Sequence, residues 1–248
     1  MNLHRLWPSP GSIEPEELLD LYAPDRGAPA VRANFVTSLD GAAEIAGVSR
    51  GLSSDADQLV LRLLRRHADA VVVGAGTLRD EGYGALKLSE ESQAWRSANG
   101  LARQPTLVVV SSRLDLDPSH RMFTAAPVRP IVLTHASAPV GRSAALTEVA
   151  DVVSVGIATV DLAAGLAALR ARGLGQLLTE GGPHLMGSLL ASDLVDELCL
   201  TVAPLLAGAG ATRIAAGPTR PEALGMRLAH LIMTDENVLL SRWVRAAA

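Results

Sequence analysis

The feature that most constrains the fold is an alternation, beginning near residue 31, of short apolar runs with segments of helical periodicity. The expected strands are residues 31–37, 70–74, 106–110, 130–134, 152–155 and 176–179, and the expected helices are residues 53–67, 160–172 and 183–192. Strands that alternate with helices favour a parallel sheet. Each helical crossover returns the chain to the end of the sheet where the previous strand began, so the next strand runs in the same direction. The sequence therefore predicts an α/β fold with a mostly parallel central sheet and helices on both faces.

The two ends of the chain depart from this alternation. Residues 196–203, 226–234 and 237–244 resemble strands, and because Asp235 and Glu236 can make a tight turn, we expect the last two to form a C-terminal antiparallel hairpin. Residues 1–30 are rich in proline and irregular, with a short helix near residues 14–22. We expect an N-terminal arm over residues 1–30, packed on the domain or across a subunit boundary, and one domain over residues 31–248.

Composition argues against several other classes of protein. The chain is 48% hydrophobic and 19% charged, which is typical of a packed globular core. A net charge of −4 gives no sign of a basic face for nucleic-acid phosphates, and no apolar run is long enough for a bilayer. The first residues do not resemble a signal peptide, and Cys199 is the single cysteine, so we expect a cytoplasmic protein. The histidines lack metal-ligand spacing, so we expect no metal site.

Four turns that follow expected strands carry residues suited to ligand binding, which in open α/β sheets takes place beyond the carboxyl ends of the strands. The first turn holds Ser38 and Asp40, followed by a glycine that lets the backbone bend beside a ligand. The second is Gly74-Ala75-Gly76-Thr77, whose amides can hold a phosphate at the start of a short helix. Either turn can also be a plain connection between two elements.

The third turn holds Ser112 and Arg113, which suit the 2′-phosphate that distinguishes NADP from NAD, although Arg113 taken alone favours a solvated loop. The fourth is Glu180 followed by Gly181, Gly182 and Pro183, where paired glycines and a proline at a helix start suit a pyrophosphate. Glu180 is unfavourable beside an anion unless it faces a polar substrate. Glu180 is therefore a candidate functional residue.

Taken together, these four turns and residues 194–198 resemble the reductase domain of the riboflavin-pathway deaminase-reductases, a pyrimidine reductase family with the dihydrofolate reductase-like fold. The resemblance runs from about residue 31 to the C-terminus, which makes residues 31–248 a reductase domain. It implies an NADPH-dependent enzyme that reduces the ribose of a 5-amino-6-(5-phosphoribosylamino)uracil-type substrate to a ribityl chain. The cofactor carries the hard chemistry in such a step, and the protein supplies orientation.

The resemblance also implies roles for individual residues. The implied cofactor-binding residues are Val36, Gly74, Gly76, Thr77, Glu81, Ser112, Arg113, Gly181, Gly182, Pro183, His184, Leu185 and Met186. The implied substrate-binding residues are Ser38, Ser49, Arg65, Lys87 and Glu180, and the implied catalytic residues are Asp40 and Glu180. Asp40 is either a proton donor or a substrate anchor. Arg65 can instead belong to a solvated helix face with the neighbouring arginines.

The sequence departs from the family pattern in three ways. The zinc-deaminase signature His-x-Glu and Pro-Cys-x-x-Cys does not occur in this sequence, so we expect deamination to belong to another protein. Asn34 stands where many members have lysine. In the loop after the Thr77 turn, residues 81–88 lack the family's phosphate-binding arginine and offer only Lys87, which is a point charge without the guanidinium fork.

These departures leave two alternatives open. The chain could reduce a pterin or dihydrofolate, or it could bind NADP without catalysis. The retained Asp40 and Glu180 favour the pyrimidine reductase. A homodimer is expected from the family and from the apolar C-terminal hairpin.

Overall fold

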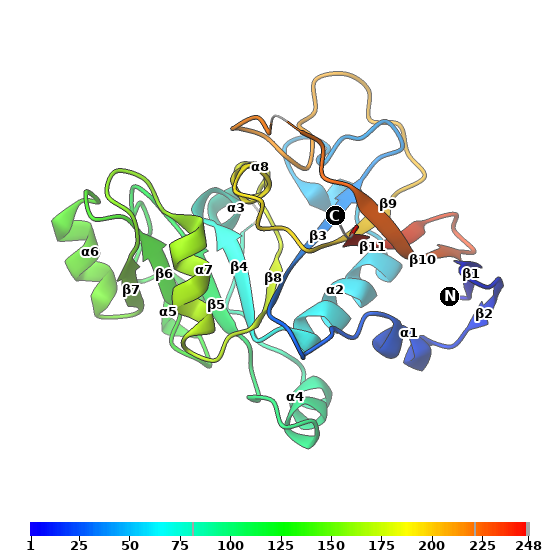
Figure 1. The fold of residues 1–248 in the computed structure, drawn as a ribbon, viewed down its shortest axis with the longest axis horizontal. Coiled ribbons are helices and arrows are strands. Elements are labelled where there is room, and N and C mark those ends of the chain that lie inside the picture. Colours follow the sequence, from blue (N-terminus) through cyan, green and yellow to red (C-terminus); the bar gives the residue numbers. More distant parts are fainter. Residues whose placement is uncertain (81, 221, 247–248) are drawn as a thin grey trace.

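The computed structural model describes residues 1–80, 82–220 and 222–246, and their strands form a single eleven-stranded sheet (Figure 1). In spatial order the strands run β2-β1-β10-β11-β9-β3-β8-β4-β5-β6-β7. Their bounds are β1 (Leu3–Trp7), β2 (Gly11–Ile13), β3 (Ala30–Thr37), β4 (Ala70–Gly74), β5 (Thr106–Val110), β6 (Ile131–Thr134), β7 (Asp151–Ser154), β8 (Gln176–Thr179), β9 (Glu197–Val202), β10 (Met226–Thr234) and β11 (Leu239–Arg245).

The strands from β9 to β7 in this order are parallel, which confirms the predicted α/β class. The predicted C-terminal hairpin is also confirmed, since β10 and β11 pair antiparallel and β11 joins β9. Strands β5 and β8 have the predicted bounds, because each is a short apolar run with a turn at both ends.

The N-terminal arm is more regular than expected. Strand β1 pairs with β10 and β2 pairs with β1, so the arm extends the sheet at its antiparallel end. Leu3, Ile13 and Leu18 of the arm are buried in the same core as the helices of the main sheet. The expectation of irregular structure is therefore wrong for these two strands, which are too short to show a period in the sequence.

Helices cover both faces of the sheet, as predicted. Their bounds are α1 (Pro15–Leu21), α2 (Asp55–His67), α3 (Ala75–Asp80), α4 (Glu90–Ala98), α5 (Arg121–Thr124), α6 (Val140–Thr147), α7 (Leu162–Arg170) and α8 (Pro183–Ala191), with a 3-10 turn η1 (Ser49–Gly51). On β4, Val71 and Val73 pack with the side that carries α1, α2 and α6, whereas Val72 packs with α7 and α8. None of the helices within the described residues is of a length and apolarity that would cross a membrane.

Helix α2 forms one wall of the site described below, and its sequence explains its position. Ser54 accepts a hydrogen bond from the Asp57 backbone N–H at 3.2 Å and so begins the helix. Val60 and Leu64 are buried against the sheet. The opposite helix face presents Arg65 toward the carboxyl edge of the sheet, where the pockets lie.

Two buried histidines make the stability of the fold depend on pH. His67 bonds the Leu19 carbonyl at 2.9 Å through Nε2, and His230 lies against Tyr22 with a ring-centroid distance of 4.6 Å. Burial lowers the pKa of each imidazole to about 4, from an ordinary value of 6.5. Between these two values the unfolded chain binds protons that the folded chain does not.

We therefore expect the free energy of unfolding to decrease as the pH falls from about 6.5 to about 4. At pH 5 the loss should be about 2 kcal/mol for each histidine, as an upper estimate from proton linkage. Urea denaturation at pH 7 and pH 5 measures it, and a His67→Gln/His230→Gln variant should show a smaller difference between the two pH values. An equal pH dependence in wild type and double variant would contradict this assignment.

Candidate active site

The turns that follow β4 and β8 meet at the carboxyl edge of the sheet. The Gly74 backbone N–H donates to the Gly181 carbonyl at 2.9 Å, and the Glu180 N–H donates to the Val72 carbonyl at 3.3 Å. The two strands are parallel neighbours, so their carboxyl ends lie at one edge. The structure thus brings together two turns that are about a hundred residues apart in the sequence.

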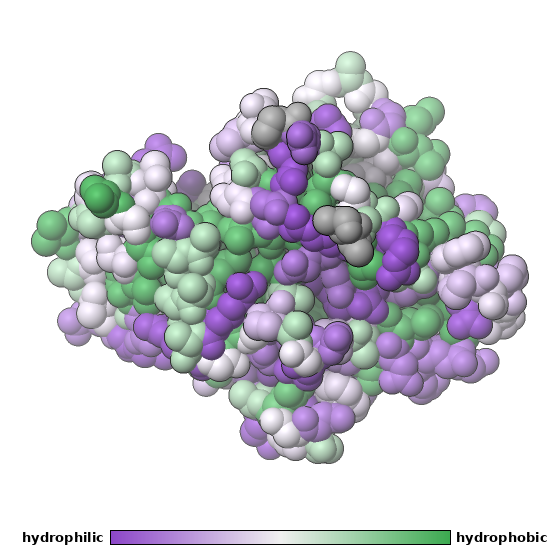
Figure 2. Space-filling view, in the orientation of Figure 1, coloured by the Kyte–Doolittle hydropathy of each residue, from purple (hydrophilic) through white to green (hydrophobic). Residues whose placement is uncertain are grey.

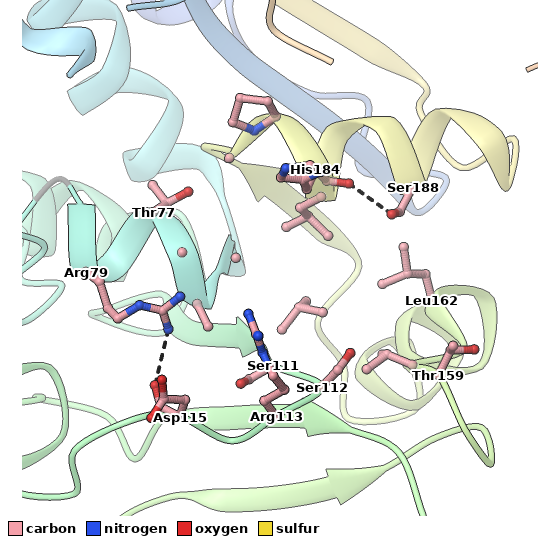
Figure 3. Close-up of a pocket in the computed structure, with 18 residues that line it drawn as sticks. Thr77, Arg79, Ser111, Ser112, Arg113, Asp115, Thr159, Leu162, His184 and Ser188 are labelled. Atoms are coloured by element: carbon pink, nitrogen blue, oxygen red, sulfur yellow. Dashed lines mark hydrogen bonds between the residues drawn. The ribbon is translucent and has the colours of Figure 1, made fainter. Parts of the chain in front are cut away.

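A first pocket of about 560 Å³ opens between these turns and the turn after β5. In Figure 3, α8 and α3 form one side of it, and Ser112, Arg113 and Thr159 lie across from α8. Figure 2 shows a notch in the surface between the lobe that carries α6 and α7 and the part that carries α8. The lining is Gly74, Ala75, Gly76, Thr77, Arg79, Val110, Ser111, Ser112, Arg113, Asp115, Thr159, Val160, Leu162, Gly182, Pro183, His184, Leu185 and Ser188.

Helix α8 presents its N-terminus to the first pocket. Gly182 is the N-cap residue and Pro183 follows it, and no side chain caps the helix there. The N–H groups of a first helical turn have no partner within the helix, and the helix dipole adds a partial positive charge. This end of the pocket is therefore suited to an anion such as a pyrophosphate.

The opposite end of the first pocket carries hydroxyls and guanidinium groups. Ser111 and Ser112 lie with Arg113 in the turn after β5, where the Ser111 hydroxyl accepts from the Leu114 N–H at 3.0 Å. Arg79 donates to the Asp115 carbonyl at 3.2 Å, which fixes the turn against α3. The Arg113 guanidinium forms no hydrogen bond or ion pair with another described residue, so it can bind an anion in the pocket.

A second pocket of about 390 Å³ shares Thr77, Gly182 and Pro183 with the first. We call these three residues the seam. Around the second pocket are α2, the end of β3 and the loop before η1. Its lining is Asn34, Phe35, Val36, Ala43, Glu44, Gly47, Ser49, Arg50, Ser53, Asp57, Gln58, Leu61, Arg65, Thr77, Tyr83, Glu180, Gly182, Pro183 and Thr212.

Glu180, Arg65 and Tyr83 form a hydrogen-bonded cluster in the second pocket. Arg65 donates two hydrogen bonds to the Glu180 carboxylate, from Nε to Oε1 and from Nη2 to Oε2, each 2.6 Å long. The Tyr83 hydroxyl donates to Glu180 Oε2 at 2.6 Å and accepts from Arg65 Nη2 at 2.9 Å. The Glu180 side chain is only 7% exposed, so this ion pair is largely removed from water.

The cluster fixes the protonation of Arg65 and Tyr83. Burial opposes the charge of Arg65, but the charge and hydrogen bonds of Glu180 outweigh it, and the pKa of Arg65 is raised. Burial and the Glu180 carboxylate raise the pKa of Tyr83 well above its usual value. Arg65 therefore stays charged and Tyr83 stays a hydrogen-bond donor at neutral pH. Among the described residues Glu180 Oε1 accepts from Arg65 alone, so it can accept a further hydrogen bond from a ligand.

The predicted residues divide between the two pockets and their surroundings. Gly74, Gly76, Ser112, Arg113, His184 and Leu185 line the first pocket, Val36, Ser49, Arg65 and Glu180 line the second, and Thr77, Gly182 and Pro183 line both. Gly181 and Met186 are not part of either lining, and Met186 is buried in the core. Lys87 lies in a separate surface groove with Ser89, Glu90 and Arg103, and Glu81 lies outside the described residues.

Tyr83 was missed by the sequence reasoning. It is one of two tyrosines in the chain, and it stands between Gly82 and Gly84 in a stretch considered only for its cations. An aromatic hydroxyl in a glycine-rich loop beside the expected site was the available signal. Its contact with Glu180, 97 residues away, depends on tertiary structure.

The sequence model of the RibD C-terminal domain matches residues 29–240. The chain belongs to the RibD C-terminal domain family.

Relatives of the chain include reductases from archaea and RibD proteins from bacteria. The chain is 32% identical over 183 residues to the 2,5-diamino-6-ribosylamino-4(3H)-pyrimidinone 5′-phosphate reductase of Archaeoglobus fulgidus, covering 73% of this chain and 82% of that protein. It is 31% identical over 196 residues to the riboflavin biosynthesis protein RibD of Mycobacterium tuberculosis, covering 78% of this chain and 48% of that protein. The chain therefore spans about half of RibD.

Solved structures agree with this placement. A pyrimidine reductase-like protein from Corynebacterium diphtheriae has a TM-score of 0.82 and 30% identity, with 89% of this chain and 93% of that chain covered. The riboflavin biosynthesis reductase Rib7 of yeast has a TM-score of 0.67 at 17% identity, which shows a common fold. The structures confirm the fold class expected from the turns, and the family resemblance is confirmed by the sequence match.

In this member of the RibD C-terminal domain family, Ser38 and Asp40 hold a loop and are not part of the pocket lining. Asp40 accepts hydrogen bonds from the Ser38 hydroxyl and from the backbone N–H groups of Ala207 and Gly208, the last at 2.8 Å. These bonds lower the pKa of Asp40 to about 2. A carboxylate with this pKa carries no proton at neutral pH, so these surroundings suit a residue that holds the loop and do not suit a proton donor.

Asp40→Asn should therefore loosen the loop over residues 204–212, which reaches the second pocket at Thr212. The amide keeps one acceptor oxygen but loses the charge that strengthens both backbone hydrogen bonds. We expect a several-fold increase in KM for the substrate of the second pocket, a smaller change in kcat, and a pH–rate profile above pH 4 that keeps its shape. Loss of an acidic or basic limb from that profile would show that Asp40 transfers a proton.

Proposed function

We propose that this chain is an NADPH-dependent reductase that delivers hydride to C1′ of the ribose in a phosphoribosylamino-pyrimidinone, as in riboflavin biosynthesis. The observation that carries the proposal is the seam, where the first and second pockets share Thr77, Gly182 and Pro183. A dinucleotide in the first pocket and a pyrimidine in the second would meet there. Holding two reactants in contact removes much of the entropic barrier, up to roughly 7–11 kcal/mol in favourable cases.

The residues of the first pocket fit a dinucleotide phosphate. The uncapped start of α8 offers N–H groups to a pyrophosphate, and a Cβ at Gly182 would lie 2.6 Å from Thr77 Oγ1, so any larger residue here would force Thr77 or the start of α8 to shift. NADPH supplies the hydride. The chain itself binds the phosphates, orients the two ligands at the seam and shields them from water.

The residues of the second pocket fit a ring that carries N–H donors. Glu180 is fixed by Arg65 and Tyr83, and Oε1 keeps capacity to accept from an amino group or ring N–H. In the ring-opened substrate, the hydride from NADPH would add two electrons and one hydrogen nucleus to the imine carbon C1′, leaving NADP⁺. The imine nitrogen would gain one further proton from solvent or a side chain, which completes the ribitylamine. Glu180 would place C1′ at the seam by holding the ring.

Ser112 and Arg113 are proposed to select NADPH over NADH through the 2′-phosphate. Arg113→Ala should then raise the KM for NADPH about tenfold or more, whereas the KM for NADH should change little. Initial rates with each cofactor at a fixed pyrimidine concentration give the two KM values, and their ratio is compared between wild type and Arg113→Ala. Equal changes for the two cofactors would rule out a 2′-phosphate contact.

The experiment that tests the proposed reaction is NADPH oxidation, followed by absorbance, with the pyrimidine substrate in two forms. One form carries the 2-amino group, as the names of the archaeal relatives indicate, and the other is the deaminated uracil form. We expect turnover of at least one and none of dihydrofolate. Turnover of dihydrofolate alone would favour a pterin reductase, and NADPH binding without any turnover would favour a binding protein.

We also propose that the chain acts in the cytoplasm as a homodimer. In the described residues β2 and β7 are the edge strands of the sheet, and Leu39, Leu205 and Leu206 are exposed apolar side chains. Exposed edges and apolar side chains favour association. Sedimentation at micromolar concentration should give twice the mass of one chain, and a monomer would contradict the proposal.

A further inference from the structure

The charged residues that line the second pocket are unevenly paired. Three acids, Glu44, Asp57 and Glu180, stand against two bases, Arg50 and Arg65. Arg65 is committed to Glu180 by two hydrogen bonds of 2.6 Å. A phosphorylated ligand would bring two more negative charges into this pocket, so a second, uncommitted cation is needed to hold it.

Arg50 has the required properties. It lies on η1, its side chain is exposed at the pocket, and its guanidinium forms no hydrogen bond or ion pair within residues 1–80, 82–220 and 222–246. Its backbone is nonetheless fixed, since the Arg50 carbonyl accepts from the Ser53 N–H at 3.3 Å. A free guanidinium on a fixed backbone is suited to bidentate recognition of a phosphate.

The position of Arg50 fits the far end of a bound sugar phosphate. The pocket follows one face of α2, on which Gln58, Leu61 and Arg65 succeed one another. Arg65 marks the end beside Glu180, whereas Arg50 and Gln58 mark the end at the start of α2, and a rise of about 1.5 Å per residue separates positions 58 and 65 by roughly 10 Å. A sugar chain that runs along α2 from the Glu180 end of the pocket would therefore bring its phosphate to the end that carries Arg50.

We propose that Arg50 recognises the 5′-phosphate of the substrate, the task for which the loop after Thr77 lacks an arginine. The inference rests on the proposed function, because it assumes that a sugar phosphate is the ligand. Lys87 is not available for this task, since it lies in a different groove beside Glu90 and Arg103. Arg50 is thus a specificity-determining residue for the phosphate and has no part in the chemical step.

The test compares Arg50→Ala, Arg50→Lys and Arg50→Glu on the substrate with and without its 5′-phosphate. Arg50→Ala should raise the KM for the phosphorylated substrate roughly 10- to 100-fold, with a much smaller change for the dephosphorylated one. Arg50→Lys should retain part of the preference, and Arg50→Glu should lose more than Arg50→Ala. Arg103→Ala, at the groove of Lys87, is the matched control and should behave as wild type. Equal effects of Arg50→Ala on both substrates would overturn the proposal.

A binding measurement separates this inference from the proposed reaction. Isothermal titration calorimetry can measure the affinity for ribose 5-phosphate and for ribose, which lacks the phosphate. This measurement does not depend on turnover. We expect wild type to bind ribose 5-phosphate more tightly than ribose, and Arg50→Ala to remove the difference. If this binding result is obtained but NADPH is not oxidised, the proposed reaction is refuted and the assignment of Arg50 to the phosphate stands. Failure of wild type to distinguish the two sugars, or an unchanged difference in Arg50→Ala, would refute the phosphate site.

Discussion

Gly182→Ala is expected to weaken NADPH binding by roughly 10- to 100-fold while the unliganded protein stays folded. The added Cβ would lie 2.6 Å from Thr77 Oγ1, well inside a normal contact distance. Thr77 is β-branched and has few alternative rotamers on a helix, so relief requires a shift of α3 or of the start of α8. Overpacking of this kind costs about 1–3 kcal/mol. Here it would displace the backbone N–H groups that face the pyrophosphate and so weaken their hydrogen bonds to it.

The identity of the clashing atom gives a sharp control for this prediction. Gly182→Ala/Thr77→Ala removes Oγ1 and should recover part of the affinity that Gly182→Ala alone loses. Gly141→Ala on α6, where an added Cβ meets nothing within 4 Å, should bind NADPH as wild type does. Fluorescence titration with NADPH and thermal unfolding without it measure both properties. Wild-type affinity in Gly182→Ala would contradict a pyrophosphate site at this turn.

Glu180→Gln is expected to lower kcat/KM for the pyrimidine substrate by roughly 10²–10³-fold. The change removes the carboxylate that faces the second pocket and leaves Arg65 without its partner in a site where the Glu180 side chain is 7% exposed. Truncating one partner of a buried charge pair costs about 2–5 kcal/mol, much of it from the charge left behind. NADPH affinity should change little, because the cluster lies on the far side of the seam.

Two further variants separate lost chemistry from lost stability at Glu180. Tyr83→Phe removes one donor to the carboxylate and should cost less than about tenfold in kcat/KM. Glu91→Gln breaks the neighbouring pair with Arg66, in which Glu91 is 81% exposed, and should leave the rate unchanged. Steady-state kinetics of Glu180→Gln, Tyr83→Phe and Glu91→Gln should give a kcat/KM that is far lower for Glu180→Gln than for the other two variants. A rank in which Tyr83→Phe equals Glu180→Gln would assign the central role to the tyrosine.

Much of the parallel sheet could be predicted from the sequence because local pattern and tertiary position agree there. Strands β5 and β8 are apolar runs bounded by turns, and burial on both faces explains why they show no alternation. The glycine turns after β4 and β8 led to the same edge of the sheet, where the Gly74 N–H meets the Gly181 carbonyl. The rule that ligands sit beyond the carboxyl ends of parallel strands was sufficient for that step.

The rest required tertiary information. Strand β1 has only five residues and depends on pairing with β10, which is more than 200 positions away in the sequence. Helix α4 buries Arg96, whose guanidinium donates to the Arg66 and Ala68 carbonyls, so its buried face did not look apolar. Asp40 was predicted to be a proton donor or a substrate anchor, and its hydrogen bonds from the Ala207 and Gly208 N–H groups, 167 and 168 positions away, could not be predicted from local sequence.

Hydride transfer between the two pockets is the central claim, and an isotope measurement tests it most directly. The protein would be incubated with the phosphoribosylamino-pyrimidine and NADPH carrying deuterium at both C4 positions, and the product would be examined by mass spectrometry and NMR. The account predicts one deuterium at C1′ of the ribityl chain. A reduced product with no deuterium at C1′, or no reduction of the pyrimidine while NADPH binds, would contradict it.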